Sequence, residues 1–221
     1  MTNRICIAVA SAGLFGWAAL STHAHAHPHV FAEARLDVVS TDDGLLDELR
    51  HVWRFDELFT STVIFEFDTN SDNELDGGEL AEVANVVTNS IADFNYFQSV
   101  SVGGEEFEIA PVNDLVVDVV DGQLIMIFTS RTSLPVSMAD NPSFSIYDPT
   151  FYTSIEFYTD GDMQMVNAPS GCGFDKVIPD PEEAIAQNQQ SLTDAWFTDP
   201  EGNDLSRIFA TRMEVTCASE G

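Results

Sequence analysis

The chain has 221 residues, with 37 acidic against eight basic side chains and a formal net charge of −29. This excess of negative charge argues against binding to nucleic acid or to anionic membrane surfaces and favours cationic partners, including divalent metal ions. A surface adapted to high salt or to solubility explains the charge equally well. With 16 Phe, three Trp and 44% hydrophobic residues, the chain can bury a sizeable core, and its length suits one domain.

Residues 1–26 predict a cleaved secretory signal peptide. Arg4 gives a positive start, residues 5–20 carry no charge, and Ala24-His25-Ala26 is a small-x-small cleavage site. The alternative is a membrane anchor, but the apolar run is short for a spanning helix and no stop-transfer charges follow it. We therefore expect a periplasmic protein without a direct membrane anchor, with one domain over residues 27–221 and a mature formal charge of −30.

The elements alternate between strand and helix patterns along the chain. Apolar residues alternate with polar ones at 32–38 and 49–55, as in half-buried strands, and then recur at helical spacing between residues 56 and 97. Turn residues mark hairpins at 99–111 and 113–129. Further strands are expected at 143–147, 154–158, 163–166, 172–177 and 213–217, and a weaker helix at 181–193. The predicted fold class is α+β: mainly antiparallel β, sandwich-like, with an inserted EF-hand-like helix-loop-helix at about 56–97.

A calcium-binding loop is predicted at residues 68–79. Calcium takes six to eight oxygen ligands, and an EF-hand loop supplies them from alternate positions and from a bidentate Glu at its twelfth position. The matching residues, in order, are Asp68, Asn70, Asp72, Glu74 (through its backbone carbonyl), Asp76 and Glu79. Position 6, where the chain turns sharply and Gly is expected, holds Asn73, which tolerates a left-handed backbone better than most residues. The alternative is an acidic surface loop, and a lone hand favours a structural or weak site over a sensor.

Three histidines suggest a second metal site. If cleavage follows Ala26, His27 offers its amine and its ring to one metal ion, with His29 two residues on and His51 on the adjacent predicted strand. Such ligands suit Ni²⁺, Co²⁺, Zn²⁺ or Cu²⁺. The alternatives are that the first two belong to a leader-like repeat of histidines and that His51 is a hydrogen-bonded core residue, because it shares a face with Leu49 and Trp53.

Two cysteines, Cys172 and Cys217, remain after the predicted cleavage. An even pair in an oxidising compartment favours one disulfide. The sequence contains no Gly-x-Ser-x-Gly elbow, phosphate loop or dinucleotide fingerprint, so we do not expect an enzyme. A histidine-brace copper oxidase at His27 is the one enzymatic alternative with a chemical basis.

The mature start, His27-Pro28-His29-Val30-Phe31, resembles an uncharacterised bacterial periplasmic family labelled as domain of unknown function 1007. The resemblance extends over the mature chain and includes residues 51–57, 68–79, 93–97, 147–150 and 209–217. Members are described as the periplasmic component of an ABC-type transport system, and the family is linked with nickel/cobalt-type exporters or permeases. The resemblance therefore implies a metal-binding accessory protein that serves a membrane metal transporter.

The sequence thus predicts a periplasmic divalent-metal-binding accessory protein of a nickel, cobalt or zinc transport system, with one calcium site. The main alternative is a calcium-stabilised interaction module without transition-metal chemistry.

Overall fold

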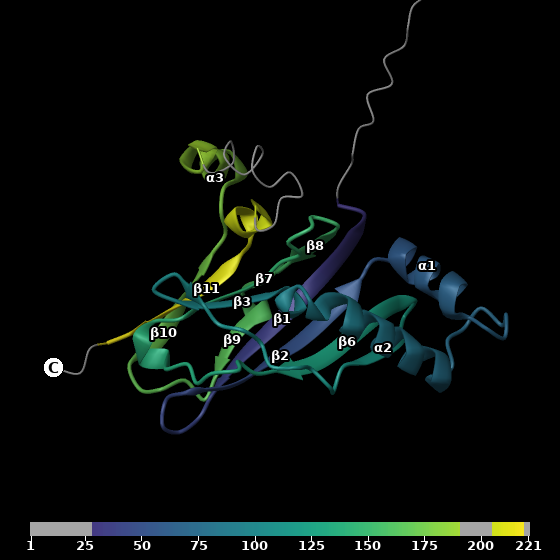
Figure 1. Cartoon of the computed structure of the whole chain (residues 1–221), viewed down its shortest axis with the longest axis horizontal. Coiled ribbons are helices and arrows are strands. Elements are labelled where there is room, and N and C mark those ends of the chain that lie inside the picture. The colour runs from purple at the N-terminus through teal and green to yellow at the C-terminus, as the bar shows by residue number, and fades with distance from the viewer. Residues whose placement is uncertain (1–27, 191–204, 219–221) are drawn as a thin grey trace, which may run out of the picture.

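Two mostly antiparallel β-sheets form the body of the protein in the computed structural model, which describes residues 28–190 and 205–218 (Figure 1). The larger sheet has the order β5 (Val116–Val120), β6 (Gln123–Ser130), β2 (Leu46–Phe55), β1 (Val30–Ser40) and β8 (Thr153–Glu156), and β9 (Met163–Val166) also pairs with β1. The smaller sheet has the order β10 (Cys172–Val177), β11 (Arg212–Cys217), β7 (Ser143–Ile146), β3 (Gln98–Val102) and β4 (Glu105–Glu106).

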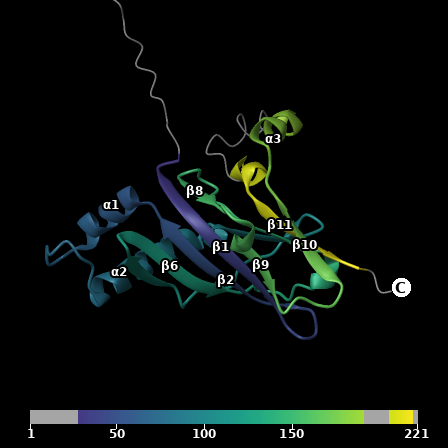
Figure 2. The same cartoon turned by 180° about the vertical axis from the view of Figure 1, so that it is seen from behind.

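Strand β1 organises the larger sheet. It pairs with β2 in antiparallel fashion on one side, whereas on the other side its first half pairs in parallel with β8 and its second half in parallel with β9. Seen from behind, β1 runs the length of this sheet, with β8 and β9 along the same edge (Figure 2). The sequence predicts the strands themselves, but the two parallel pairings were not expected.

One continuous core joins the sheets and the helices. The alternating residues of β1 and β2 face inward together, because the register places Ala34 opposite Trp53 and Leu36 opposite His51. The smaller sheet contributes Val100 and Phe144 to the same cluster of buried side chains. The α+β class with two mostly antiparallel sheets is therefore confirmed.

Helices α1 (Glu57–Phe67) and α2 (Gly77–Ala92) lie beside the larger sheet (Figure 1). Although α1 is rich in β-branched residues, it is held by its N-cap Asp56 and by burial of Thr60 and Val63. Helix α2 buries Val83 and Ile91 and begins with a capping box. Packing and capping thus outweigh the low intrinsic helix propensity of α1.

The remaining helices are short. Helix α3 (Pro181–Gln187) is shorter than the predicted helix, of which residues 191–193 lie outside the described ranges. The 3₁₀ turns are η1 (Asn95–Phe97), η2 (Met138–Asp140), η3 (Asp160–Asp162) and η4 (Leu205–Phe209). Within the described ranges, no helix is long and apolar enough to cross a membrane. The predicted signal peptide lies outside these ranges.

The predicted disulfide is confirmed. Cys172 and Cys217 lie opposite each other at the ends of β10 and β11, and a disulfide joins them. A disulfide persists in an oxidising compartment, so this bond fits a protein that works outside the cytoplasm.

Candidate calcium loop and the predicted histidine site

The loop that follows Phe67 connects two docked helices. Asp68 caps the C-terminus of α1, and its backbone N–H donates to the carbonyl oxygen of Ile64 at 2.9 Å. At the other end, Asp76 caps α2, and its carboxylate accepts hydrogen bonds from the N–H groups of Gly78 and Glu79. Both ends of the loop are therefore fixed by the helices, and the predicted helix-loop-helix is present.

The backbone of the loop coils around the carboxylate of Asp68. One oxygen of this carboxylate accepts from the N–H of Ser71 at 2.6 Å, and the other accepts from the N–H of Asn73 at 2.8 Å. Asn73 has a φ of 65°, in the left-handed region. This is the backbone that position 6 of a calcium loop requires, and Asn adopts it here in place of Gly.

Side-chain oxygens at alternate positions stabilise the coil in the same way. Asn70 accepts from the N–H of Asp72, and Asp72 accepts from the N–H of Glu74, each at 2.9 Å. Positions 1, 3, 5 and 9 of the predicted calcium loop thus each carry a side-chain oxygen bonded to a backbone N–H a few residues ahead.

Hydrogen bonds within the loop hold Glu79 in place. Its side chain is buried, and one carboxylate oxygen accepts from both the N–H and the hydroxyl of Thr69 at 2.7 Å. The other oxygen accepts from the N–H of Asp76 at 3.0 Å. The hydrogen bond from Asp76, followed by those from Thr69, lowers the pKa of the Glu79 carboxyl, so the group is anionic at neutral pH.

The oxygen atoms of this loop fit calcium chemically, although their side chains do not converge on one point. Within residues 28–190 and 205–218, no group of three His, Cys, Asp or Glu side chains stands ready to hold a metal ion. The loop oxygens instead accept backbone hydrogen bonds. Since an ionised carboxylate has about four acceptor positions, it can keep an N–H donor and still ligate a cation. The donor set contains only hard oxygens, which calcium and magnesium prefer over nitrogen or sulfur.

The structure does not bring the three predicted histidines together. His27 lies outside the described residues, and His29 is exposed just before β1, where its ring packs against Tyr152. His51 is 1% exposed and pairs in register with Leu36, seven residues along β1 from His29. Seven strand residues span about 23 Å, which is too far for one ion. His51 therefore lies apart from the predicted transition-metal site.

His51 instead belongs to a buried polar network between the sheets. Its ring stacks on Phe128, and its Nε2 lies 3.1 Å from the hydroxyl of Ser130. The Ser130 hydroxyl donates to Oε1 of Gln98 at 2.6 Å, so it accepts from His51, whose proton is therefore on Nε2. Burial lowers the pKa of His51 from 6.5 to about 3, so the ring is neutral at physiological pH.

The family comparison covers nearly the whole chain. The model of a family described as a protein of unknown function, DUF1007, matches residues 13–217. The chain belongs to this family. A similar protein is the uncharacterised 15.5 kDa protein in the trpE 3′ region of Spirochaeta aurantia, 21% identical over 136 residues, which cover 62% of this chain and 97% of that protein. The family model thus covers most of the length of this DUF1007 protein, and the family description assigns no activity.

Sequence reasoning missed two groups of residues around these sites. Thr69 was not considered, although its position next to the first loop ligand, with a backbone N–H and a hydroxyl to offer, is a readable signal. Ser130 and Gln98 were also missed, because only the tertiary fold places β3 and β6 against His51.

Proposed function

We propose that this DUF1007 protein is a metal-binding accessory protein that works outside the cytoplasm and holds one calcium ion in the EF-hand-like loop at residues 68–79. The observation that carries the proposal is the coil of this loop around Asp68, with Asn73 in the left-handed backbone at position 6. Asp and Asn side chains form such turns in other loops too, but a calcium loop specifically needs the left-handed backbone at its sixth position.

The calcium site is structural rather than a switch. Val63 of α1 and Val83 and Ile91 of α2 are already buried in the core, so the two helices have little freedom to open when the ion binds. Calcium instead offsets the repulsion among the loop carboxylates and fixes α1 relative to α2. A dissociation constant of about 10⁻⁴ to 10⁻³ M, as in extracellular modules, is sufficient for this role.

Isothermal titration with Ca²⁺ tests the proposal. We expect one site in the wild-type protein and no measurable binding in Asp68→Ala or Glu79→Gln. The matched control is Glu82→Gln, which removes an exposed carboxylate from the same helix as Glu79 but outside the loop. Equal calcium binding in all four proteins would assign the effect to the general negative charge and refute the loop site.

The transition-metal part of the proposal rests on His27 and His29 alone. His29 stands at the exposed start of β1, where a chain beginning at His27 would place a terminal amine and two imidazoles within three residues. Native mass spectrometry of protein secreted to the periplasm, mixed with Ni²⁺, Co²⁺, Zn²⁺ or Cu²⁺, measures both the start of the chain and the bound metal. Loss of that metal in His29→Ala supports a site at His27 and His29, and unchanged binding excludes this site.

A further inference from the structure

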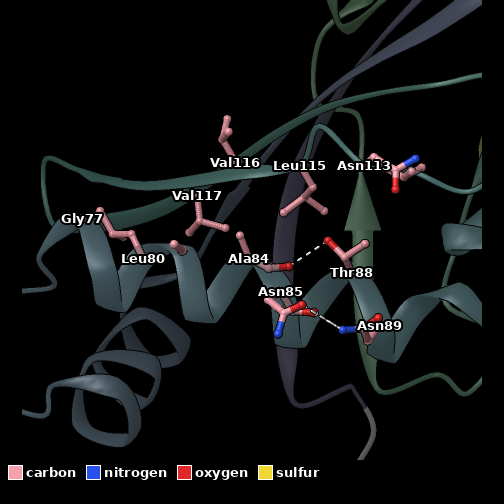
Figure 3. Close-up of a pocket in the computed structure, with 12 residues that line it drawn as sticks. Gly77, Leu80, Ala84, Asn85, Thr88, Asn89, Asn113, Leu115, Val116 and Val117 are labelled. Carbon is pink, nitrogen blue, oxygen red and sulfur yellow. Dashed lines mark hydrogen bonds between the residues drawn. The ribbon is translucent and has the colours of Figure 1, made fainter.

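Two open grooves of similar size differ in how their polar side chains are bonded. The groove of about 590 Å³ between helix α2 and strand β5 has no charged residue in its described lining. Its Thr88 and Asn89 side chains donate to the carbonyl oxygens of Ala84 and Asn85 in their own helix (Figure 3). These polar groups are already satisfied, so this groove shows no unmet need for a polar ligand.

The second groove, of about 640 Å³, has a floor of four serines on the smaller sheet. The register places Ser99 of β3 opposite Ser145 of β7 and Ser101 opposite Ser143, so each pair of hydroxyls lies side by side. The residues between these serines belong to the core. Because successive side chains of a strand point to opposite faces, the serines face away from the core and into the groove.

Most of these hydroxyls have no protein partner. Ser99, Ser101 and Ser145 are between 6% and 8% exposed. The hydroxyl of Ser99 donates to the carboxylate of Glu106 at 2.9 Å. The hydroxyls of Ser101, Ser143 and Ser145 make no hydrogen bond to another residue within the described ranges. A hydroxyl can both donate and accept, so these three groups are available to a polar ligand in the groove.

The walls of the groove carry charges of both signs. Arg212 of β11 lies opposite Ser145, and Arg207 lines the groove from η4. Asp180 and Glu183 line it from the N-terminal end of α3. Helix α3 and η4 lie at the same end of β10 and β11 (Figure 1). Two of the eight basic residues of the chain thus meet two carboxylates around the serine floor.

The charged groups keep capacity to bind a ligand. Arg212 donates from its Nε to Glu214, which leaves its two Nη nitrogens. One oxygen of Glu183 accepts from the side chain of Gln187 at 2.8 Å, and one oxygen of Asp180 accepts from the N–H of Glu183 at 2.9 Å. Each of these carboxylates therefore has a second oxygen to offer.

The lining indicates the class of ligand. It contains no aromatic side chain among the described residues, which argues against a flat ring that would stack. Cations and carboxylates on separate elements match a molecule that carries both charges. The net charge of −29 repels small anions, whereas a zwitterion has no net charge to be repelled. Val177 and Ile208 add apolar surface for an aliphatic side chain.

We propose that this groove binds a small zwitterion with an aliphatic side chain, either a free α-amino acid or a dipeptide. The ligand's carboxylate bonds to Arg212 and to the serine hydroxyls, and its ammonium group bonds to Glu183 and Asp180. Its side chain packs against Ile208. This site shares no residue with the calcium loop, and binding does not require calcium.

Isothermal titration in EDTA with L-leucine and with leucyl-leucine tests the proposal. We expect saturable binding at one site, and the tighter of the two ligands tells a free amino acid from a dipeptide. N-acetyl-leucine lacks the ammonium group and leucinamide lacks the carboxylate. Each is expected to bind about tenfold or more weakly than L-leucine, because a hydrogen bond to a charged group is lost.

Matched variants locate the binding site. Glu183→Gln is expected to weaken binding of L-leucine about tenfold, whereas Glu182→Gln, exposed on the same helix but outside the groove, binds as the wild type does. Arg212→Gln is expected to weaken binding by a similar factor, and its control is Arg35→Gln on the larger sheet. Thermal denaturation checks that all four variants fold.

Three results would overturn the proposal. The first is the absence of saturable binding of both L-leucine and leucyl-leucine. The second is leucinamide binding as tightly as L-leucine, which would show general attraction of a cation to the acidic surface. The third is equal affinity in each variant and its control. Calcium titration is a separate measurement, so failure of the groove and failure of the calcium loop are distinguishable.

Discussion

Asn73 has a left-handed backbone at the point where the proposed calcium loop turns most sharply. Because Gly adopts this conformation without steric cost, Asn73→Gly is expected to raise calcium affinity severalfold and to stabilise the calcium-free protein by about 0.5–1 kcal/mol. Titration calorimetry and urea denaturation measure the two effects.

Asn73→Ala provides the opposite control. A Cβ without the local hydrogen bonding of Asn makes the left-handed conformation more costly, so this variant is expected to bind calcium more weakly than the wild type. If Gly, Asn and Ala at this position gave the same affinity, the conformation of Asn73 would have no part in binding.

His51 makes stability depend on pH. Its pKa in the folded protein is about 3, below the ordinary value of 6.5, because burial disfavours the charged ring. Between these two pKa values, the unfolded chain therefore binds a proton at His51 and the folded protein does not. Stability is complete above pH 6.5 and is lost as the pH falls from 6.5 toward 3, by about 2 kcal/mol at pH 5. Urea denaturation at pH 7 and pH 5 measures this loss.

The comparison with His51→Phe isolates this contribution from that of the many carboxylates. Phe fills a similar volume against Phe128 but cannot titrate, so the variant is expected to lose about 2 kcal/mol less than the wild type between pH 7 and pH 5. Parallel losses in the two proteins would show that His51 is not the responsible group. Burial lowers the pKa of His51 more than the hydrogen bond with Gln98 and the charge of Asp114 raise it.

At the scale of single elements, helix α2 begins at a residue with two roles. Asp76 caps the helix and also occupies position 9 of the loop. Asp76→Ala is expected to destabilise the protein by about 1 kcal/mol through loss of the cap, and to weaken calcium binding as well. Thermal denaturation in EDTA measures the first effect, and calcium titration measures the second.

Asp76→Asn separates the two roles. Asn caps a helix about as well as Asp but carries no charge, so this variant is expected to keep its stability in EDTA and to bind calcium more weakly. A loss of stability in EDTA as large as that of Asp76→Ala would show that the charge of Asp76, rather than its capping bond, supports the helix.

Most elements were predictable because their signals are local. The alternation in β1 and β2, the turn at Asp121 and the cap of α2 each lie within a few residues of sequence. The parallel pairing of β8 and β9 with β1 was not predictable, because it depends on which surfaces meet after more than 100 intervening residues.

The residues of the candidate sites were likewise predictable only where their signal is local in the sequence. The proposed loop ligands follow one another within twelve residues, so their spacing alone predicts a calcium loop. For His51 the sequence left a metal ligand and a core histidine as alternatives, and only the fold shows Ser130 and Gln98 beside it. The place of β5 at the edge of the larger sheet was not predictable, because a strand's position in a sheet is not encoded in its own residues.

For the molecule as a whole, the bond between Cys172 and Cys217 closes a loop with a sequence separation of 45. Replacing both cysteines by Ser is expected to lower the free energy of unfolding by about 3–4 kcal/mol, chiefly because the unfolded chain gains freedom. Urea denaturation of oxidised protein measures this loss. Reduction of the wild-type protein should give the same value, and a much smaller loss would show that the unfolded chain remains compact.

The position of β1 determines the order in which the chain can fold. Val30–Ser40 can form a hairpin with β2 early, but its other edge remains open until residues 153–166 have emerged from the ribosome. Such distant pairing slows folding, because closing the intervening loop costs chain entropy before any stabilising contact forms. A chain that cannot complete its first strand until late is expected to remain unfolded longer than one that pairs only locally. The same delay exposes a pairing edge that a holding chaperone would have to shield.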